Sequence, residues 1–271
     1  MYMKIQLIQS RDNPKLKQLR ALLNSNRARQ QDNLTVLEGA HLCSAWLQRQ
    51  LPVISAWISE TGQQDIEINA VLRQLPDRAT VYILPDTLFQ QVSSLETGAA
   101  LCCIIEPKLQ VIDLVRPHDC VVLDAVQDPG NVGTILRTAA AAGVQEAWLG
   151  QGCASAWAPK TLRAGMGAHC VINITEGVSL PEILPTIDAT TIAADVQAKH
   201  SLFDMNLRMP IAWIFGNEGQ GLSEPVLSLV QARIFIPQSP VIESMNVAAA
   251  AAVSLFEMRR QRLFANNKAS N

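Results

Sequence analysis

The stretch CVVLDAVQDPGNVGTILRTAAAAG, residues 120–143, carries the clearest structural signal in the chain. Its first seven residues are almost continuously apolar, which is typical of a parallel strand covered on both faces. The following DPGNVGTILRTAAAAG predicts a turn, a helix and a glycine that ends the helix. A buried strand that leads directly into a helix is the building unit of an α/β sheet.

The same alternation continues toward the end of the chain. We expect further strands at QEAWLG, VINIT, ATTIAA, IAWIF and ARIFI, which are residues 145–150, 171–175, 189–194, 211–215 and 232–236. A long helix is expected in SMNVAAAAAVSLFEMRRQRLF, residues 244–264. Strands alternating with helices predict a mostly parallel sheet with right-handed crossovers.

The first hundred residues predict a smaller α/β domain. Asn13 and Pro14 suit the start of a helix that carries leucines at helical spacing within residues 10–31. A strand and a helix follow in 33–50, then a strand at 52–59, a helix at 67–74, a strand at 79–84, a helix at 86–94 and a strand at 100–105. We predict an α/β domain at 1–106, a linker at 107–118 and a second α/β domain at 119–271.

Composition narrows the class of protein. The chain has 271 residues, a net charge of −2 and six cysteines, none of them in a CxxC pair, so we expect buried reduced thiols and no metal site. No stretch of about 18 apolar residues lacks charges, and the first residues do not read as a signal peptide. We therefore expect a soluble, cytoplasmic protein without a membrane partner.

Basic residues gather near the two ends of the chain. Residues 1–31 hold seven lysines and arginines and a single acidic residue, Asp12, and four more basic residues lie at 259–268. Such a distribution favours local contact with a polyanion such as RNA, although a solvated helix face has the same pattern. The predicted RNA-binding residues are Arg11, Lys15, Lys17, Arg27 and Arg29.

Three loops follow expected strands of the second half, namely QDPGNVGTILR (127–137), GNEGQGLS (216–223) and PQSPVIESMN (237–246). Open α/β sheets bind ligands beyond the carboxyl ends of their strands, so these loops converge if their strands are neighbours. Neither a P-loop nor a GxGxxG fingerprint is present. The glycines of the second loop either let backbone approach a flat adenine or form a tight turn with Ser223 as a helix cap.

Several polar residues stand out beside these loops. Arg137 lies in an otherwise apolar helical stretch and requires an anionic partner, either a ligand or a structural carboxylate. Asn131 can cap the same helix, Ser244 can cap the last helix, and Asn246 falls in the first turn of the last helix. The alanines at 248–252 suit close packing within the chain or a self-interface, and plain helix propensity explains them equally well.

Together the three strings resemble the three motifs of the SpoU, or TrmH, family of SPOUT RNA methyltransferases. DPGNVGTILRTAAAAG resembles the first motif, IFGNEGQGLS the second and IPQSPVIESMNVAAAAAVSLFEMRRQR the third. The resemblance covers about residues 119–264. NPKLKQLRALL and LEGAHL in the first hundred residues are similar to the substrate-binding domain that is fused to many members. The resemblance implies an α/β catalytic domain with a deep trefoil knot, and a homodimer whose sites are completed across the interface.

It also implies transfer of a methyl group from S-adenosylmethionine (AdoMet) to a ribose 2′-hydroxyl of RNA, with rRNA favoured over tRNA. The implied cofactor-binding residues are Gly216, Asn217, Gly221, Ile236, Pro237, Met245 and Asn246. The implied catalytic group is Asn131, Arg137, Glu218, Ser244 and Asn246. Because an arginine does not lose its proton near neutral pH, we expect Arg137 to orient the nucleotide and stabilise the developing alkoxide. A phosphate, a water molecule or Glu218 would accept the proton.

The chain departs from the family at three positions of the third motif. Pro240 stands where a glycine is usual, Met245 where a leucine is usual and Ala248 where a serine is common. Pro240 removes an amide donor, which would weaken cofactor binding if the family uses that amide. An RNA-binding homodimer without transferase activity is therefore the alternative function.

Overall fold

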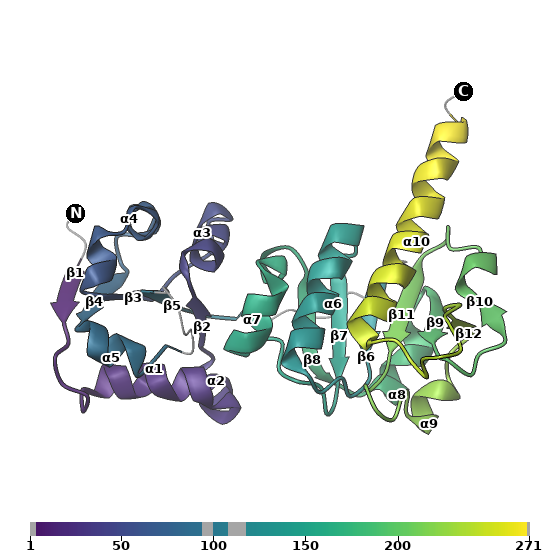
Figure 1. The fold of residues 1–271 in the computed structure, drawn as a ribbon, viewed down its shortest axis with the longest axis horizontal. Helices are drawn as coiled ribbons and strands as arrows, with labels where there is room; N and C mark the ends of the chain where they lie inside the picture. The colour runs from purple at the N-terminus through teal and green to yellow at the C-terminus, as the bar shows by residue number, and fades with distance from the viewer. Residues whose placement is uncertain (1–3, 94–99, 108–117, 270–271) are drawn as a thin grey trace. The chain divides into compact units, whose positions relative to one another are not determined.

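The computed structural model describes residues 4–93, 100–107 and 118–269 (Figure 1). The chain forms two compact units. The first unit comprises Met1–Lys108 together with Trp157–Cys170, and the second comprises Leu109–Ala156 and Val171–Asn271. Most of the expected linker, residues 107–118, falls outside the described residues.

The first unit contains a mixed five-stranded sheet in the order β1-β4-β3-β5-β2. β1, β3 and β4 run parallel, whereas β5 pairs antiparallel with both β3 and β2. The strands are β1 (Lys4–Leu7), β2 (Thr35–Glu38), β3 (Ser55–Ser59), β4 (Thr80–Leu84) and β5 (Leu101–Ile105). The helices are α1 (Pro14–Asn24), α2 (Asn26–Asp32), α3 (Ala40–Gln48), α4 (Ile66–Leu72), α5 (Asp86–Gln90) and α7 (Pro159–Gly165).

The leucine spacing noted in the sequence builds the core beneath this sheet. Leu16, Leu19 and Leu22 recur on one face of α1 and pack with Trp57, Tyr82 and Phe89 from the sheet and α5. Trp57 and Tyr82 stack with ring centroids 4.2 Å apart. Asn13 accepts a hydrogen bond from the backbone N–H of Lys15 at 2.9 Å, which confirms the predicted helix start.

The segment Trp157–Cys170 packs in the first unit although it lies between two strands of the second. The Thr35 hydroxyl on β2 donates to the carbonyl of Trp157 at 2.6 Å, and Arg163 on α7 forms an ion pair with Glu38 at the end of β2. α7 thus covers β2, which is an edge strand of the sheet. No feature of the sequence had indicated this placement.

The second unit contains a parallel seven-stranded sheet in the order β10-β12-β9-β11-β6-β7-β8, so the predicted parallel sheet is confirmed. Its strands are β6 (Cys120–Leu123), β7 (Glu146–Gly150), β8 (Asn173–Val178), β9 (Thr190–Ala194), β10 (His200–Ser201), β11 (Ile211–Phe215) and β12 (Ala232–Phe235). Its helices are α6 (Pro129–Ala142), α8 (Leu180–Ile183), α9 (Glu224–Leu227) and α10 (Val247–Ala269). The deep knot implied by the resemblance stays a prediction.

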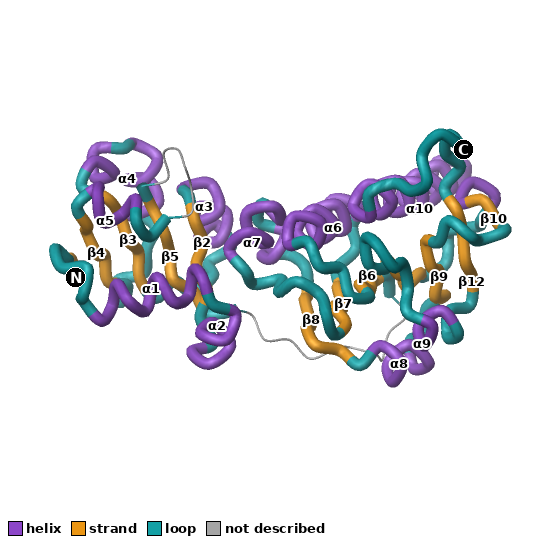
Figure 2. The backbone as a smooth tube through the Cα atoms, turned by 60° about the horizontal axis from the view of Figure 1, so that its bottom comes forward, coloured by secondary structure: helices purple, strands orange, loops and turns teal. Residues whose placement is uncertain are grey.

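Figure 2 shows how the helices of this unit form layers, with α6 and α10 along one face of the sheet and α8 and α9 along the other. α6 and α10 pack directly against each other, although their sequences are more than a hundred residues apart. The strands that lie between the two layers of helices are buried, including every residue of β6, β7 and β11. The near-continuous apolar runs of the sequence are explained by this double coverage.

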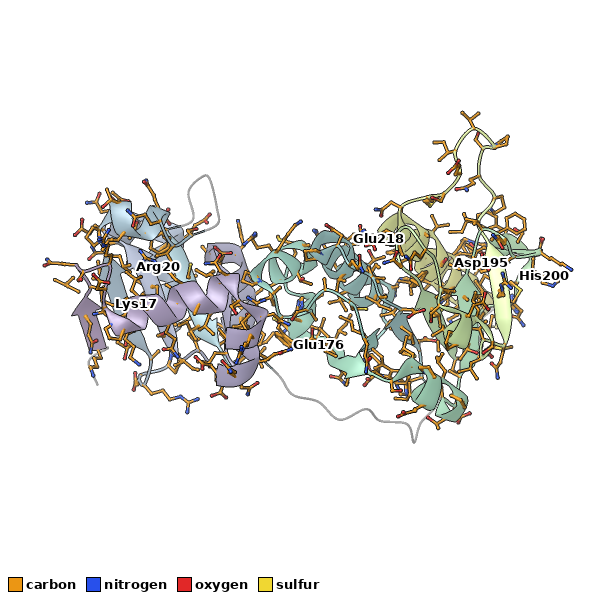
Figure 3. The ribbon with its side chains drawn as sticks, turned by 90° about the horizontal axis from the view of Figure 1, so that it is seen from below. Lys17, Arg20, Glu176, Asp195, His200 and Glu218 are labelled. Carbon is orange, nitrogen blue, oxygen red and sulfur yellow. The ribbon has the colours of Figure 1, made fainter. Side chains whose placement is uncertain are left out.

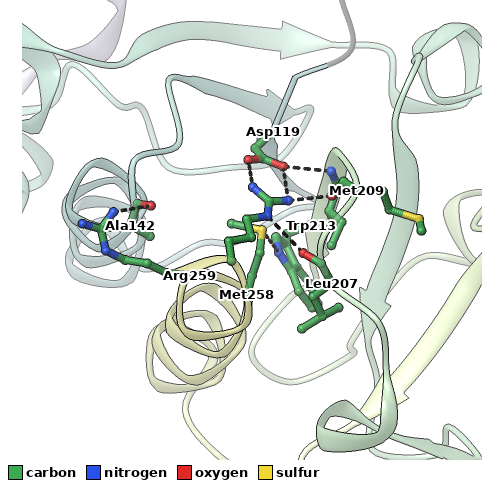
Figure 4. A network of polar contacts seen from close by, with 9 residues as sticks. Asp119, Ala142, Leu207, Met209, Trp213, Met258 and Arg259 are labelled. Carbon is green, nitrogen blue, oxygen red and sulfur yellow. Dashed lines mark hydrogen bonds and ion pairs between the residues drawn. The ribbon is translucent and has the colours of Figure 1, made fainter. Parts of the chain in front are cut away.

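A polar network fixes α10 beside the amino ends of the strands (Figure 4). The guanidinium of Arg262 pairs with the carboxylate of Asp119 and donates to the carbonyls of Leu207 and Met209. The Asp119 carboxylate also accepts the backbone N–H of Ile211 at 2.9 Å, just where β11 begins. Arg259 donates to the carbonyl of Ala142 at the end of α6.

One expectation of local structure was wrong, and two short strands were missed. The helical stretch within 10–31 divides into α1 and α2, because Ser25 leaves the helical conformation and its hydroxyl caps α2. The strands β1 and β10 were not predicted, since four and two residues carry too little periodicity to be recognised.

None of the helices in the described part of the chain combines the length and the apolar character that a membrane span requires.

Candidate active site

The three polar loops of the second unit meet because their strands are close neighbours. β12, β9, β11 and β6 are consecutive in the sheet, and the loops at 216–223 and 237–246 follow β11 and β12. A cavity of about 550 Å³ lies at these carboxyl ends. It is lined by residues 194–197 after β9, 215–222 after β11, and Ile236, Gln238 and 244–247 after β12.

The glycine-rich loop folds tightly upon itself. The backbone groups of Asn217 and Gly221 exchange two hydrogen bonds, of 2.8 and 3.0 Å. A Cβ atom on Gly216 would lie 2.5 Å from the carbonyl group of Gly221, so no side chain fits there. Gly221 itself has φ of +72°, a conformation that favours glycine. These two glycines therefore shape the cavity wall as well as lining it.

Asn217 connects this loop to the loop that precedes α6. Its side-chain N–H donates to the carbonyl of Ala125 at 2.8 Å, while its side-chain oxygen accepts the backbone N–H groups of Gly219 and Gln220. Ala125 is held at φ of +55°, which is strained for a residue with a Cβ atom. Strain of this kind is often found beside functional sites, where surrounding contacts maintain it.

Glu218, which is labelled in Figure 3, makes the second connection between the same two loops. One carboxylate oxygen accepts the backbone N–H of Gln127 at 3.1 Å. The other accepts the backbone N–H of Asp128 at 3.1 Å and the side-chain N–H of Asn131 at 2.9 Å. The carboxylate is exposed yet engaged on both oxygens, so it joins the glycine-rich loop to the first turn of α6.

Asn131 also joins the first turn of α6 to the third loop, residues 237–246. Its side-chain oxygen accepts the side-chain N–H of Asn246 at 3.0 Å. Asn246 in turn caps α10, because its side-chain oxygen accepts the backbone N–H groups of Ala248 and Ala249. Glu218, Asn131 and Asn246 thus form one continuous chain of hydrogen bonds, which we call the Glu–Asn–Asn chain.

The helix caps differ from those expected. Asp128, rather than Asn131, caps α6 by accepting the backbone N–H of Asn131 at 2.9 Å. Asn246, rather than Ser244, caps α10. The Asn131 side chain is consequently turned toward Glu218 and Asn246 instead of toward the end of α6. Ser244 is exposed and lines the cavity.

The protonation of Glu218 follows from its surroundings. Partial burial raises the pKa of the carboxyl group, but hydrogen bonds from Asn131 and from the backbone outweigh that effect and leave the pKa below its usual value. A carboxylate with a lowered pKa and both oxygens occupied is a weak proton acceptor. The geometry therefore favours Glu218 as an anchor over Glu218 as a base.

Most residues expected to hold the cofactor come together at the cavity. Gly216, Asn217, Gly221, Ile236, Met245 and Asn246 all line it, and Pro237 does not. Pro240 is exposed and is also absent from the lining. Glu218 and Ser244 line the cavity, whereas Asn131 reaches it only through its hydrogen bonds to Glu218 and Asn246.

Arg137 is the exception among the expected catalytic residues. α6 is amphipathic, and Val132, Ile135, Leu136 and Ala139 are buried on one face while Arg137 is exposed on the other. The residue does not line the cavity of its own chain. Within the described part of the chain its guanidinium makes no hydrogen bond or ion pair, so the structural carboxylate considered from the sequence is not observed.

The expected RNA-binding residues lie on the first unit. Arg11, Lys15, Lys17 and Arg27 are exposed, and Figure 3 shows Lys17 and Arg20 on α1. Arg29 corrects the expectation, because it is only 8% exposed and its guanidinium donates to the carbonyl of Leu22 at 2.7 Å. It therefore stabilises the end of α1.

Three residues at the site were missed from the sequence. The buried carboxylate of Asp124 accepts the backbone N–H of Ser223 at 2.7 Å, which fixes the end of the glycine-rich loop to β6. Asp195 and Arg233 form an ion pair at the cavity wall. The position of Asp124 in the string LDAV was a usable signal, because a charged residue inside an apolar strand pattern requires a partner. No signal in the sequence indicated that Asp195 pairs with Arg233.

The donor set of the site is suited to an organic ligand. Backbone groups, amides and apolar side chains dominate the cavity, and its volume lies in the range of small-molecule sites. Among the described residues, no group of three or more histidine, cysteine, aspartate or glutamate side chains could hold a metal ion.

Comparison with known proteins identifies the relatives of this chain. Residues 119–256 match the SpoU rRNA Methylase family, and residues 13–102 match the MRM3-like substrate binding domain. An uncharacterized tRNA/rRNA methyltransferase of Synechocystis is 37% identical over 268 residues, 94% of each chain. The 23S rRNA (guanosine(2553)-2′-O)-methyltransferase RlmP of Bacillus subtilis is 30% identical over 258 residues, 93% of this chain and 98% of that protein.

A solved structure shares the fold. The AdoMet-bound rRNA methyltransferase from Sinorhizobium meliloti has a TM-score of 0.83 at 24% identity, and the match covers 94% of this chain and 98% of that one. The match therefore includes most of both units of this chain.

Proposed function

The chain belongs to the SpoU rRNA methylase family, and from this premise we propose that it transfers a methyl group from AdoMet to the 2′-hydroxyl of a ribose in rRNA. The observation that carries the proposal is the Glu–Asn–Asn chain, which joins the three motif loops at one cavity. The action of the Bacillus relative on 23S rRNA favours rRNA over tRNA as the substrate.

The cavity fits the cofactor in size and in chemistry. Its volume of about 550 Å³ suits a nucleoside with an amino-acid tail, and its wall combines glycine-loop backbone and apolar side chains with polar and charged groups. We assign Gly216, Ile236 and Met245 to holding the cofactor through backbone groups. When bound, AdoMet supplies a methyl group activated by its positive sulfur.

The Glu–Asn–Asn chain positions the loops that form the cavity. Glu218 fixes the glycine-rich loop to the first turn of α6, and Asn131 extends the connection to Asn246 at the start of α10. Holding the reacting groups in a fixed geometry lowers the entropic part of the barrier. The proton of the ribose hydroxyl then passes to a phosphate or to water, because Glu218 is engaged and has a lowered pKa.

Arg137 acts in a second copy of the chain. It is exposed on α6 and does not line its own cavity, so its place beside the ribose is at the cavity of a partner. There the guanidinium orients the nucleotide and stabilises negative charge that develops on the 2′-oxygen. A self-interface along α10 would bring it there, since Ala249, Val253 and Phe256 form an apolar stripe and Phe256 is 47% exposed.

Mixing two inactive variants tests this division between subunits. Arg137→Ala keeps an intact cavity, and Gly216→Ala keeps the arginine but destroys the cavity, because its Cβ atom collides with backbone. Each homodimer is expected to be inactive, whereas the mixed dimer has one complete site. Activity that does not recover on mixing, in dimers shown to have exchanged subunits, contradicts action of Arg137 across the interface.

The activity itself is tested by two measurements. Calorimetry with AdoMet should give saturable binding, and mass-spectrometric mapping of 2′-O-methyl groups in rRNA and tRNA should reveal a site that depends on the gene. A dependent site in tRNA would overturn the choice of rRNA. RNA binding with neither AdoMet binding nor methylation would establish the inactive RNA-binding dimer instead.

A further inference from the structure

A second hollow adjoins the proposed cofactor cavity. It has a volume of about 480 Å³ and lies along β10 and the start of β12, at the edge of the parallel sheet. Its described lining consists of residues 197–200, Met205 and residues 230–233. Gln197 and Arg233 line both hollows, so these two residues form the wall between them.

The shared wall is built around Arg233. Its Nε and Nη2 atoms both donate to one carboxylate oxygen of Asp195, and the other oxygen accepts the backbone N–H of Gln197 at 2.9 Å. Asp195 therefore fixes both the arginine and the turn that leads to Lys199. The Nη1 atom of Arg233 has no hydrogen-bond partner in the described part of the chain.

The outer hollow carries the positive charge of Lys199, which has no acidic partner among the described residues. His200 lines it from the edge strand β10, and Lys199 lines it from the turn just before that strand. Both side chains are exposed, and neither forms a hydrogen bond or an ion pair with the described residues. No aspartate or glutamate belongs to the described lining. The hollow thus offers cationic donors to an anionic ligand.

We propose that the hollow lined by Lys199, His200 and Arg233 binds a phosphodiester group of the RNA substrate beside the cofactor cavity. The inference rests on the proposed function. A carboxylate on the tail of AdoMet has the same charge, but Lys199 and His200 do not line the cofactor cavity and lie beyond the shared wall. A polyanion that extends past the cofactor reaches Lys199, His200 and Arg233.

The alternative role for Lys199 is to protect the edge of the sheet. Charged residues on an edge strand discourage pairing with the sheet of another molecule, and that role alone would leave RNA affinity unchanged. The two roles are therefore separable by measuring RNA affinity and aggregation on the same variant.

The test uses the full chain and an unmodified 23S rRNA transcript. The double variant Lys199→Ala/His200→Ala is compared with the wild type and with Arg208→Ala. The control removes an exposed positive charge of the same unit that lies before the amino end of β11 and has no partner among the described residues. RNA affinity is measured by fluorescence anisotropy over a range of salt concentrations, AdoMet affinity by calorimetry and steady-state kinetics by methyl transfer.

We expect the double variant to bind the transcript roughly five- to tenfold more weakly and to lower the salt slope by about one, because one or two phosphate contacts are lost. KM for RNA should rise by a similar factor, with kcat and AdoMet affinity unchanged. RNA affinity equal to that of Arg208→Ala, or a loss of AdoMet affinity, would overturn the inference. If the wild type methylates no rRNA, the proposed function fails, and the anisotropy measurement still decides whether this surface binds RNA.

Discussion

Replacing Glu218 by glutamine distinguishes an anchoring carboxylate from a catalytic base. Glutamine keeps the acceptor oxygen that serves Asp128 and Asn131 but places an N–H₂ group opposite the backbone N–H of Gln127. One charge-assisted hydrogen bond is lost and a donor faces a donor. After a discount for the exposure of this carboxylate, the loss is about 1–2 kcal/mol.

If that free energy is what orders the cavity wall, AdoMet affinity should fall by about 5- to 30-fold. Calorimetry measures this fall directly, and single-turnover methyl transfer at saturating AdoMet measures the remaining chemical step. The chemical rate should change by less than about tenfold, because the proton does not pass to Glu218. Loss of a general base instead costs about 10²- to 10⁴-fold in rate.

A matched control is available in the same cavity. Glu224 is exposed and lines the cavity, and its carboxylate has no hydrogen-bond partner among the described residues. Glu224→Gln removes the same charge without removing a connection, so its AdoMet affinity should stay near the wild-type value. A Glu218→Gln enzyme that binds AdoMet normally but has lost a hundredfold or more of its chemical rate would refute the anchoring role.

Four further outcomes are expected. Arg262→Ala should lower the free energy of unfolding in urea by about 2–4 kcal/mol, since it breaks a largely buried pair with Asp119, whereas Arg259→Ala should cost about 1 kcal/mol; equal effects would contradict the role of the network in Figure 4. Because the pKa of Glu218 is lowered by folding, its contribution is complete above the unfolded value of about 4.3 and is lost as the pH falls through the folded pKa. AdoMet affinity should therefore decline on acidification in the wild type, and the part of that decline due to this group should be absent in Glu218→Gln. Ala125→Gly should raise the free energy of unfolding by up to about 1 kcal/mol by relieving a left-handed alanine, and a clear loss would show that the strain is not costly. Pro240→Gly should leave the AdoMet dissociation constant unchanged, because Pro240 does not line the cavity, and tighter binding measured by calorimetry would show that an amide donor matters at this position.

Local signals in the sequence predicted much of the second unit. The run at 211–215 and the first four residues of the run at 120–126 became buried strands, because helices cover both faces of the sheet. Asn13 became a helix cap because a cap depends on only a few neighbouring residues. The prediction that Arg29 binds RNA was wrong. A charge pattern cannot distinguish a guanidinium that faces solvent from one that donates to a backbone carbonyl, as Arg29 does to Leu22.

The segment 157–170 marks another limit of sequence reasoning. Its neighbours on both sides belong to the second unit, yet Trp157 and Arg163 contact Thr35 and Glu38 of the first. These contacts join residues more than 120 positions apart. Periodicity and capping can predict that this segment contains a helix. They do not indicate which sheet the helix covers.

The sequence by itself determined the alternation of strands and helices and the three loops that follow buried strands, because these depend on residues only a few positions apart. The tertiary structure decided which loops meet, and it did so through the order of strands in the sheet. Glu218 contacts Asn131 across 87 positions and Asn131 contacts Asn246 across 115, so these bonds exist only after the sheet has assembled. Arg137 on the exposed face of α6 likewise follows from how the helix packs, since only packing fixes which face of an amphipathic helix is left for solvent or for a partner.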